Sequence, residues 1–146
     1  MSVRPMTEQD IAAVIDMWYQ TPNMALNNVD DTPEGVSRFL RRNPGLSYVA
    51  EEDGRIVGVI LSGHDGRRGY IYHASVLPEY RSRGIGGELA QACIKAMKTE
   101  GIVKMAVVLF ARNTRGSEFW QRQGFTKRDD LEYQDTFILP IERIVT

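Results

Sequence analysis

Residues 75–87 have the side chains and the spacing best suited to chemistry, because an apolar stretch there runs into a basic turn rich in glycine. Three glycines let a ligand approach the backbone N–H groups, and two arginines add full positive charges. A helix that begins in this turn has unpaired N–H groups and partial positive charge at its first residues, which attract phosphate oxygens. The segment therefore predicts a site for a diphosphate. Its important residues are Arg81, Arg83, Gly84, Gly86 and Gly87.

The same turn has other interpretations, which differ in what surrounds the glycines. A loop with two solvated arginines stays open as an explanation of an isolated G-x-G sequence. A dinucleotide site of the Rossmann type needs Gly or Ala two residues beyond Gly87, where this chain has Leu89. A Walker-type phosphate loop is excluded because no Gly-Lys-Ser or Gly-Lys-Thr sequence follows.

The hydrophobic pattern predicts the elements that position this turn. Apolar residues at helical spacing predict a helix after Thr7 and Asp10, which have the form of a capping box, and another after Thr32. Two further helices are predicted after the turn, and the strands include three in succession, most simply an antiparallel meander. The order describes an α/β domain on a mixed sheet. The predicted strands cover residues 3–6, 48–52, 55–62, 69–77, 103–110 and 136–139.

Composition limits the class of protein. The chain of 146 residues is 42% hydrophobic and 25% charged, which is ordinary for one globular domain, expected here over residues 1–146. No apolar stretch reaches the roughly 20 residues that span a bilayer, and no secretory signal is evident. A net charge of −1 argues against nucleic acids and membranes as partners. The single cysteine, Cys93, and the lack of metal-ligand spacing predict a cytoplasmic protein without a metal.

Two segments together resemble the GNAT superfamily of N-acetyltransferases. Residues 81–86 match the family signature R/Q-x-x-G-x-G/A, and residues 76–80 have the V-x-P-x-x spacing that commonly precedes it. A second family pattern, an asparagine before a short helix and a Gly-Phe or Gly-Tyr pair, is similar to Asn113 with Gly124 and Phe125. The predicted order of elements is also that of the family, so the resemblance covers nearly the whole chain.

The resemblance implies a fold, a co-substrate and a reaction. The implied fold is a mixed, mostly antiparallel sheet of about six or seven strands with a splayed central pair, flanked by about four helices. The implied reaction is transfer of an acetyl group from acetyl-CoA to an amine of a small molecule or peptide. A homodimer is compatible with the resemblance.

The resemblance also implies where the coenzyme binds. In similar proteins the pantetheine arm lies between the two splayed strands and bonds to their backbones as an added strand would. By position, Val76 and Leu77 would supply those contacts, and Asn113 would bond the arm further along. The pyrophosphate would lie on the turn and the first helical residues. The residues implied there are Arg81, Ser82, Arg83, Gly84, Ile85, Gly86 and Gly87.

Acetylation of an alkyl ammonium group, whose pKa is about 10.4, needs a proton acceptor. Tyr70 and Tyr72 alternate on one strand face where relatives place catalytic His or Glu residues, and either could orient a water. His73 has the right chemistry but should point to the opposite face unless a bulge redirects it. His64 and Glu79 are weaker candidates, since each is more simply a solvated turn or loop residue.

Trp120 stands where many relatives place a tyrosine that protonates the leaving thiolate. An indole N–H donates a hydrogen bond without giving up its proton, so Trp120 would only stabilise the thiolate, and Tyr133 is a substitute donor. Asp30 and Asp31 lie where acceptors enter in similar folds and, with Tyr70, would bind a cationic amine. The two aspartates could equally be a solvated flank of the next helix.

Two functions of other classes stand as alternatives. An acyl-CoA-binding regulatory module without turnover would explain Trp120 and the lack of an obvious base. A nucleic-acid binder would use the arginines of two turns, although the acidic residues elsewhere argue against it. Those arginines are Arg67, Arg68, Arg81 and Arg83.

Overall fold

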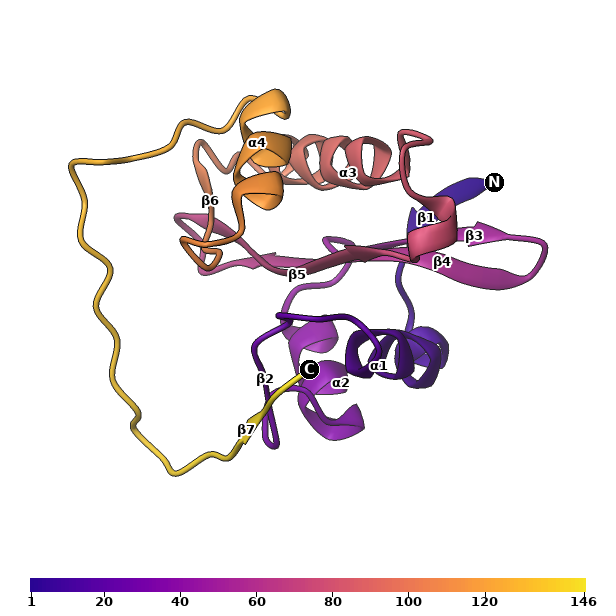
Figure 1. Ribbon diagram of the computed structural model, residues 1–146, viewed down its shortest axis with the longest axis horizontal. Helices are drawn as coiled ribbons and strands as arrows, with labels where there is room; N and C mark the ends of the chain where they lie inside the picture. The colour runs from indigo at the N-terminus through magenta and orange to yellow at the C-terminus, as the bar shows by residue number, and fades with distance from the viewer.

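Helices cover both faces of a five-stranded sheet in the computed structural model, which describes residues 1–146 (Figure 1). The elements in chain order are β1 (Ser2–Pro5), η1 (Glu8–Asp10), α1 (Ile11–Tyr19), β2 (Leu26–Asn27), α2 (Pro33–Arg42), β3 (Tyr48–Glu52), β4 (Arg55–His64), β5 (Gly69–Val76), η2 (Pro78–Tyr80), α3 (Ile85–Thr99), β6 (Met105–Val107), α4 (Thr114–Arg122) and β7 (Arg143–Ile144). Helices α3 and α4 lie on one face of the sheet. Helices α1 and α2 lie on the other face, with the small sheet of β2 and β7.

The large sheet has the strand order β1-β3-β4-β5-β6, in which only β5 and β6 run parallel. Strands β3, β4 and β5 form the predicted antiparallel meander. The parallel pair joins only residues 69–71 to residues 105–107, after which β5 continues to Val76 while β6 ends. The predicted splayed pair is therefore present, and β5 has a free edge on its β6 side beyond Ile71.

A β-bulge in β5 changes which face its side chains occupy. Two adjacent residues of β4 pair with His73 and Ile71, so Tyr72 is an extra residue in the ladder. Ile71 belongs to the hydrophobic cluster under α3, whereas the His73 ring packs against Trp18 of α1 on the opposite face. In a regular strand these two residues would share a face.

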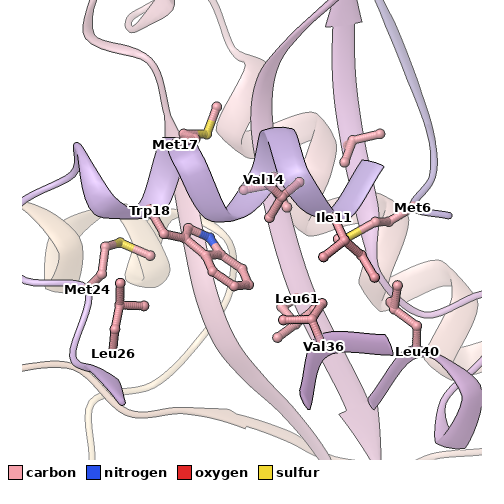
Figure 2. Packing of buried hydrophobic residues seen from close by; sticks show 12 residues of the cluster. Met6, Ile11, Val14, Met17, Trp18, Met24, Leu26, Val36, Leu40 and Leu61 are labelled. Carbon is pink, nitrogen blue, oxygen red and sulfur yellow. The ribbon is translucent and has the colours of Figure 1, made fainter. Parts of the chain in front are cut away.

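The layer of α1 and α2 rests on a cluster of twelve buried hydrophobic residues (Figure 2). The apolar stripe of α1 points into this cluster, as its helical spacing predicted, and Trp18 is fully buried. Burial of this apolar surface is the main force that holds the helices on the sheet. The members are Met6, Ile11, Val14, Met17, Trp18, Met24, Leu26, Val36, Leu40, Val49, Val59 and Leu61.

Helices α3 and α4 each end in a turn at a glycine. Gly101 and Gly124 have positive φ angles of 78° and 97°. The N–H group of the residue after each glycine bonds back to a carbonyl oxygen of the last helical turn, that of Met97 or Trp120, at 3.0 Å. None of the helices is both long and apolar enough to cross a bilayer.

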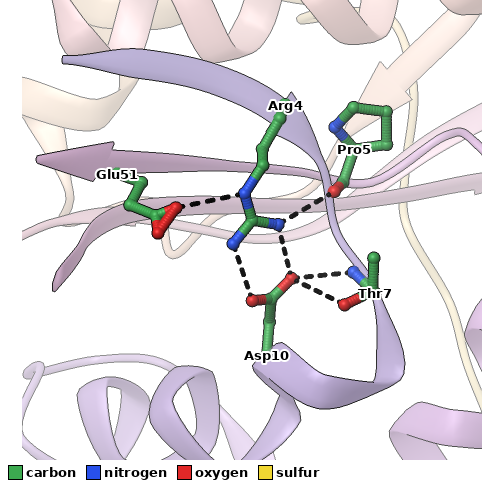
Figure 3. Close-up of polar contacts among 5 residues, drawn as sticks. All are labelled: Arg4, Pro5, Thr7, Asp10 and Glu51. Carbon is green, nitrogen blue, oxygen red and sulfur yellow. Dashed lines mark hydrogen bonds and ion pairs between the residues drawn. The ribbon is translucent and has the colours of Figure 1, made fainter. Parts of the chain in front are cut away.

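A polar network ties β1 to the start of α1 and to β3 (Figure 3). Arg4 donates two hydrogen bonds to the carboxylate of Asp10, at 2.8 and 2.9 Å, and a third to Glu51 at 3.2 Å. The predicted capping box is present, and the Thr7 N–H group donates to Asp10 at 2.8 Å. Because Asp10 is nearly buried, this network satisfies a carboxylate that would otherwise be costly to desolvate.

The strands predicted in the C-terminal part of the chain are partly wrong. The strand expected over residues 103–110 is only Met105–Val107, because its second half parts from β5 and has no other strand to pair with. The closing strand expected over residues 136–139 does not form. Residues 126–142, here named the C-terminal arm, pass around the outside of the molecule from α4 to β7 (Figure 1). Strand β7 pairs instead with β2.

Replacing Asp10 by Asn should lower the free energy of unfolding at pH 7 by about 1–2 kcal/mol, because a charged hydrogen-bond acceptor is lost. Hydrogen bonds from Arg4 lower the pKa of Asp10, so the stabilisation is present at neutral pH. It disappears as the pH falls below the unfolded-state pKa of about 3.9 and through the folded-state value. Urea unfolding at pH 7 and pH 3 measures this, with Asp16→Asn on the exposed side of α1 as control. An equal loss at both pH values would contradict the prediction.

Candidate active site

The basic turn before α3 has a run of unpaired backbone donors. None of the N–H groups of residues 82–87 donates a hydrogen bond within the protein, and Glu88 makes the first helical bond, to Gly84 at 3.1 Å. Gly84 is the N-cap with φ 81°, and Ser82 also has a positive φ of 63°. The left-handed conformations curl the turn around these donors, so it can bind an anion with many oxygens.

The glycines of this turn have a second role in packing. A Cβ atom on Gly86 would lie 3.1 Å from the Phe119 ring of α4, so glycine lets α3 and α4 approach closely. A Cβ atom on Gly87 would only touch Gln123 at an ordinary 3.4 Å. Gly86 is therefore explained by helix packing as well as by access to the backbone.

The two arginines of the turn interact with their own segment. Arg81 donates from Nε to the carbonyl oxygen of Val76 at 3.0 Å. Arg83 lies over the Tyr80 ring, 5.0 Å from its centroid, with Nη1 3.9 Å from the carboxylate of Glu52. Both side chains are exposed, so a bound anion can compete for them.

The free edge of β5 exposes the backbone groups of Ala74 and Val76, and not those of the expected pair Val76 and Leu77. Leu77 donates its N–H group to Val57 at 2.9 Å and accepts from the N–H group of Tyr80 at 2.9 Å, so both of its backbone groups are occupied. Backbone direction alternates along a ladder, and therefore Ala74 and Val76 turn their N–H and C=O groups away from β4. Ala74 was not predicted from the sequence, although it lies two residues before Val76 and therefore has the same backbone direction.

Asn113 caps α4 beside the gap between β5 and β6. Its side-chain oxygen accepts from the N–H group of Gly116 at 2.9 Å. A Cβ atom on Gly116 would lie 2.6 Å from the Asn113 amide nitrogen, so glycine at this position makes room for the capping side chain. The amide nitrogen of Asn113 makes no hydrogen bond within the protein and faces a cavity.

His73 and Asp31 form a close pair on the α1 side of the sheet. His73 Nε2 lies 2.8 Å from Asp31 Oδ1, and the two side chains are 11% and 5% exposed. The other carboxylate oxygen of Asp31 accepts from the N–H group of Asn27 at 2.8 Å. Because a carboxylate only accepts, the shared hydrogen belongs to Nε2, and Nδ1 of a neutral His73 is left with a free lone pair.

Local hydrogen bonds hold Asp31 in place. The Asn27 side-chain oxygen accepts from two N–H groups of the turn that precedes α2, and Thr32 caps the helix by accepting from Gly35 at 3.0 Å. A Cβ atom on Gly35 would lie 2.3 Å from the carbonyl oxygen of Val29, so only glycine lets α2 begin this close to the turn. Asp31 is thus a positioned residue and not a solvated flank.

Tyr72, the bulged residue, has its ring against α2. The ring meets Phe39 edge-on with centroids 5.3 Å apart, and Tyr70 lies 6.3 Å away. Tyr72 is 55% exposed, and its partial burial with the nearby Tyr70 raises the pKa of its phenol. Because an ordinary phenol, with a pKa of about 10, is already protonated at neutral pH, Tyr72 is a poor base. Asp30 is exposed and accepts from the side-chain amide of Asn27 at 2.9 Å.

The remaining candidates lie apart from one another, and Glu79 is an exposed residue of η2 paired with Arg55 at 3.5 Å. Trp120 is buried in the α3–α4 layer between two phenylalanine rings, whereas Tyr133 is exposed on the C-terminal arm. His64 pairs with Glu100 at 2.7 Å on the surface. Cys93 is fully buried, and burial raises the pKa of its thiol to about 12, so it is a core residue as expected. No three His, Cys, Asp or Glu side chains are grouped to hold a metal ion.

Two cavities meet at Tyr72 and His73. The smaller, of about 450 Å³, lies under α2 and is lined by Asp30, Asp31 and Phe39. The larger, of about 1260 Å³, runs along the gap between β5 and β6, past Ala74, Asn113 and Trp120, and reaches the C-terminal arm. The arrangement can hold two reactants whose reacting ends meet beside His73.

Comparison with known proteins agrees with this arrangement. The sequence pattern of the Acetyltransferase (GNAT) family matches residues 12–125. The chain belongs to the GNAT acetyltransferase family. An acetyltransferase of Yersinia pestis is 31% identical over 145 residues, covering 99% of this chain and 97% of the relative. An acetyltransferase of Sodalis glossinidius is 29% identical with similar coverage.

Solved GNAT structures have the same fold. An aminoglycoside N-acetyltransferase, AAC(6′)-Iy, in complex with a bisubstrate analogue, has a TM-score of 0.75 and 19% identity, covering 93% of this chain and 97% of that one. The PaiA N-acetyltransferase of Thermoplasma acidophilum, in complex with coenzyme A, has a TM-score of 0.74 and 20% identity over 88% of this chain and 92% of that one. The predicted family, fold class and acetyltransferase activity are confirmed.

Proposed function

We propose that this protein transfers the acetyl group of acetyl-CoA to an amine, and that His73 accepts the proton that the amine must lose. The observation that carries this proposal is the His73–Asp31 pair at the point where the two cavities meet. The larger cavity suits a long donor molecule, and the smaller one suits a small acceptor.

The proposed acetyl-CoA site consists mainly of backbone groups. The unpaired N–H groups of residues 82–87 would bind the diphosphate, supported by Arg81 and Arg83. Beyond the turn, Ala74 and Val76 offer strand-like backbone groups to the pantetheine arm, for which Arg81 must release the Val76 carbonyl. Asn113 would bond the arm from the other side of the gap with its free amide nitrogen.

The chemistry needs a neutral amine nitrogen beside the thioester. The nitrogen attacks the carbonyl carbon, the carbon–sulfur bond breaks, and the thiolate of the coenzyme leaves while one amine proton passes to His73 Nδ1. Asp31 holds Nε2–H and stabilises the imidazolium that forms. The thiolate, with a pKa of about 8.5, leaves without an acid, which fits the buried Trp120 at the place of the usual tyrosine.

This arrangement weakens the case for a regulatory module. That alternative depended on the lack of an obvious base, whereas His73 is paired and oriented in the structure. We further propose a cytoplasmic location, because the only cysteine is free and buried and needs no oxidising compartment.

We also propose a homodimer in which the C-terminal arm of each copy pairs with the β6 edge of the other. Five large apolar side chains of the arm are exposed, Ile138 at 92%, and the sequence there favours a strand. Analytical ultracentrifugation should show a dimer for the wild type and a monomer for a Phe137→Lys, Leu139→Lys variant. A monomeric wild type at micromolar concentration would contradict this. The exposed residues are Leu131, Tyr133, Phe137, Ile138 and Leu139.

Replacing His73 by Ala should lower kcat by about 10²–10⁴-fold, the usual contribution of a general base, and leave coenzyme affinity unchanged. Added imidazole should restore part of the rate. Asp31→Asn should lower kcat without such rescue, since the imidazole is present but no longer held. His64→Ala is the control and should keep full activity. A His73→Ala enzyme as fast as the wild type would overturn the assignment.

Replacing Gly87 by Glu should weaken coenzyme A binding at least tenfold relative to Gly87→Gln, because only the former repels a diphosphate. Both side chains have room beside Gln123, and Glu is favourable in the first turn of a helix, so both variants should fold. Calorimetry with coenzyme A measures the difference, and pantetheine, which has no diphosphate, should bind both variants equally. Equal coenzyme A affinities of the Gly87→Glu and Gly87→Gln variants would contradict the proposed diphosphate site.

A further inference from the structure

Two arginines of α2 lie at the smaller cavity without a partner in the protein. Arg38 and Arg42 are four residues apart, so they share one helix face, and both line the cavity beside Tyr72 and His73. Neither makes a hydrogen bond or an ion pair, whereas Arg41 is paired with Glu8 at 3.0 Å. Arg42 lies in the last turn of α2, where a positive charge interacts favourably with the helix dipole. Arg38 lies too far from the end of the helix for this interaction.

The two carboxylates that line the cavity form no ion pair with Arg38 or Arg42. Asp31 is occupied by His73 and by the N–H group of Asn27. Asp30 is the one remaining carboxylate on the cavity wall, and it makes a hydrogen bond to the side chain of Asn27. The cavity therefore offers one carboxylate for an ammonium group and two unpaired guanidinium groups for an anion. A polycationic acceptor would meet like charge here.

We propose that the acceptor is an amine that also bears an anionic group, a carboxylate or a phosphate, which Arg38 and Arg42 bind while the amine lies beside His73. The inference rests on the proposed acetyl transfer. A guanidinium group binds either anion through paired N–H donors, and two of them on one helix face fix the orientation of the acceptor. A cavity of about 450 Å³ fits a small molecule.

Three amines with the same five-carbon chain test the class of acceptor. δ-Aminovalerate has an anionic tail, n-pentylamine an apolar one and cadaverine a cationic one. We expect kcat/KM for δ-aminovalerate to exceed that of the other two by about tenfold or more, the value of a charge-assisted hydrogen bond. Comparing kcat/KM for phosphoethanolamine with that for ethanolamine repeats the test with a phosphate group. The size of the preference in the two comparisons shows whether a carboxylate or a phosphate is favoured. The proposal is overturned if n-pentylamine or cadaverine is acetylated as well as either anionic amine.

Variants of α2 assign the preference to the arginines. Arg38→Ala and Arg42→Ala should each lose most of the preference for the anionic amine, because kcat/KM should fall far more for δ-aminovalerate than for n-pentylamine. Arg38→Lys should keep part of the preference. Arg41→Ala removes the same charge from the same helix but lies outside the cavity, so it should behave as the wild type. Equal losses in all three alanine variants would contradict a specific site.

Equilibrium binding separates this inference from the proposed reaction. Calorimetry of δ-aminovalerate and phosphoethanolamine with the protein saturated with coenzyme A needs no turnover. Binding that Arg38→Ala abolishes, and that Arg41→Ala leaves intact, supports the anion site even if no amine is acetylated. Absence of arginine-dependent binding for both compounds overturns the anion site even if simple amines are acetylated.

Discussion

One extra residue in β5 determines the geometry of the site. The bulge at Tyr72 turns His73 to the α1 face, where Trp18 and Asp31 hold its ring. Without the bulge, His73 would point under α3, away from any acceptor. The same strand parts from β6 directly after Ile71, so the redirected histidine lies where the gap opens. The bulge and the end of the β5–β6 pairing are therefore adjacent in β5.

In the proposed arrangement, binding of the donor depends on backbone groups and binding of the acceptor depends on side chains. Residues 82–87 and the free edge of β5 present N–H and C=O groups that any sequence with this backbone would have, which suits a co-substrate shared by a whole family. The acceptor cavity is lined by side chains of α2 and its preceding turn, including Asp30, Arg38 and Phe39. Substitutions in the smaller cavity can therefore change the specificity for the acceptor without altering the backbone groups proposed to bind the coenzyme.

The sequence predicted those parts of the molecule that depend on local patterns. The capping box after Thr7, the helix start at Thr32 and the motif before α3 were identified because each is encoded in a few adjacent residues. The sheet face on which His73 lies depends on the register between β4 and β5. The pairing of Asp31 with His73 joins residues 42 positions apart in the sequence. The hydrophobic periodicity of the sequence contains neither piece of information. No local sequence pattern marks Arg38 and Arg42, because their place at the cavity depends on how α2 packs against the sheet. The closing strand over residues 136–139 had strand-like composition but no strand beside it.

In the proposed complex, the coenzyme lies along the free edge of β5 with its diphosphate on the turn before α3. Amide chemical shifts of isotope-labelled protein, titrated with coenzyme A, test this placement. The amides of Ala74, Val76 and residues 82–87 are expected to shift together with coenzyme A, and pantetheine is expected to leave the amides of residues 82–87 in place. Saturating coenzyme A that shifts other amides and leaves those of residues 82–87 in place would contradict this placement.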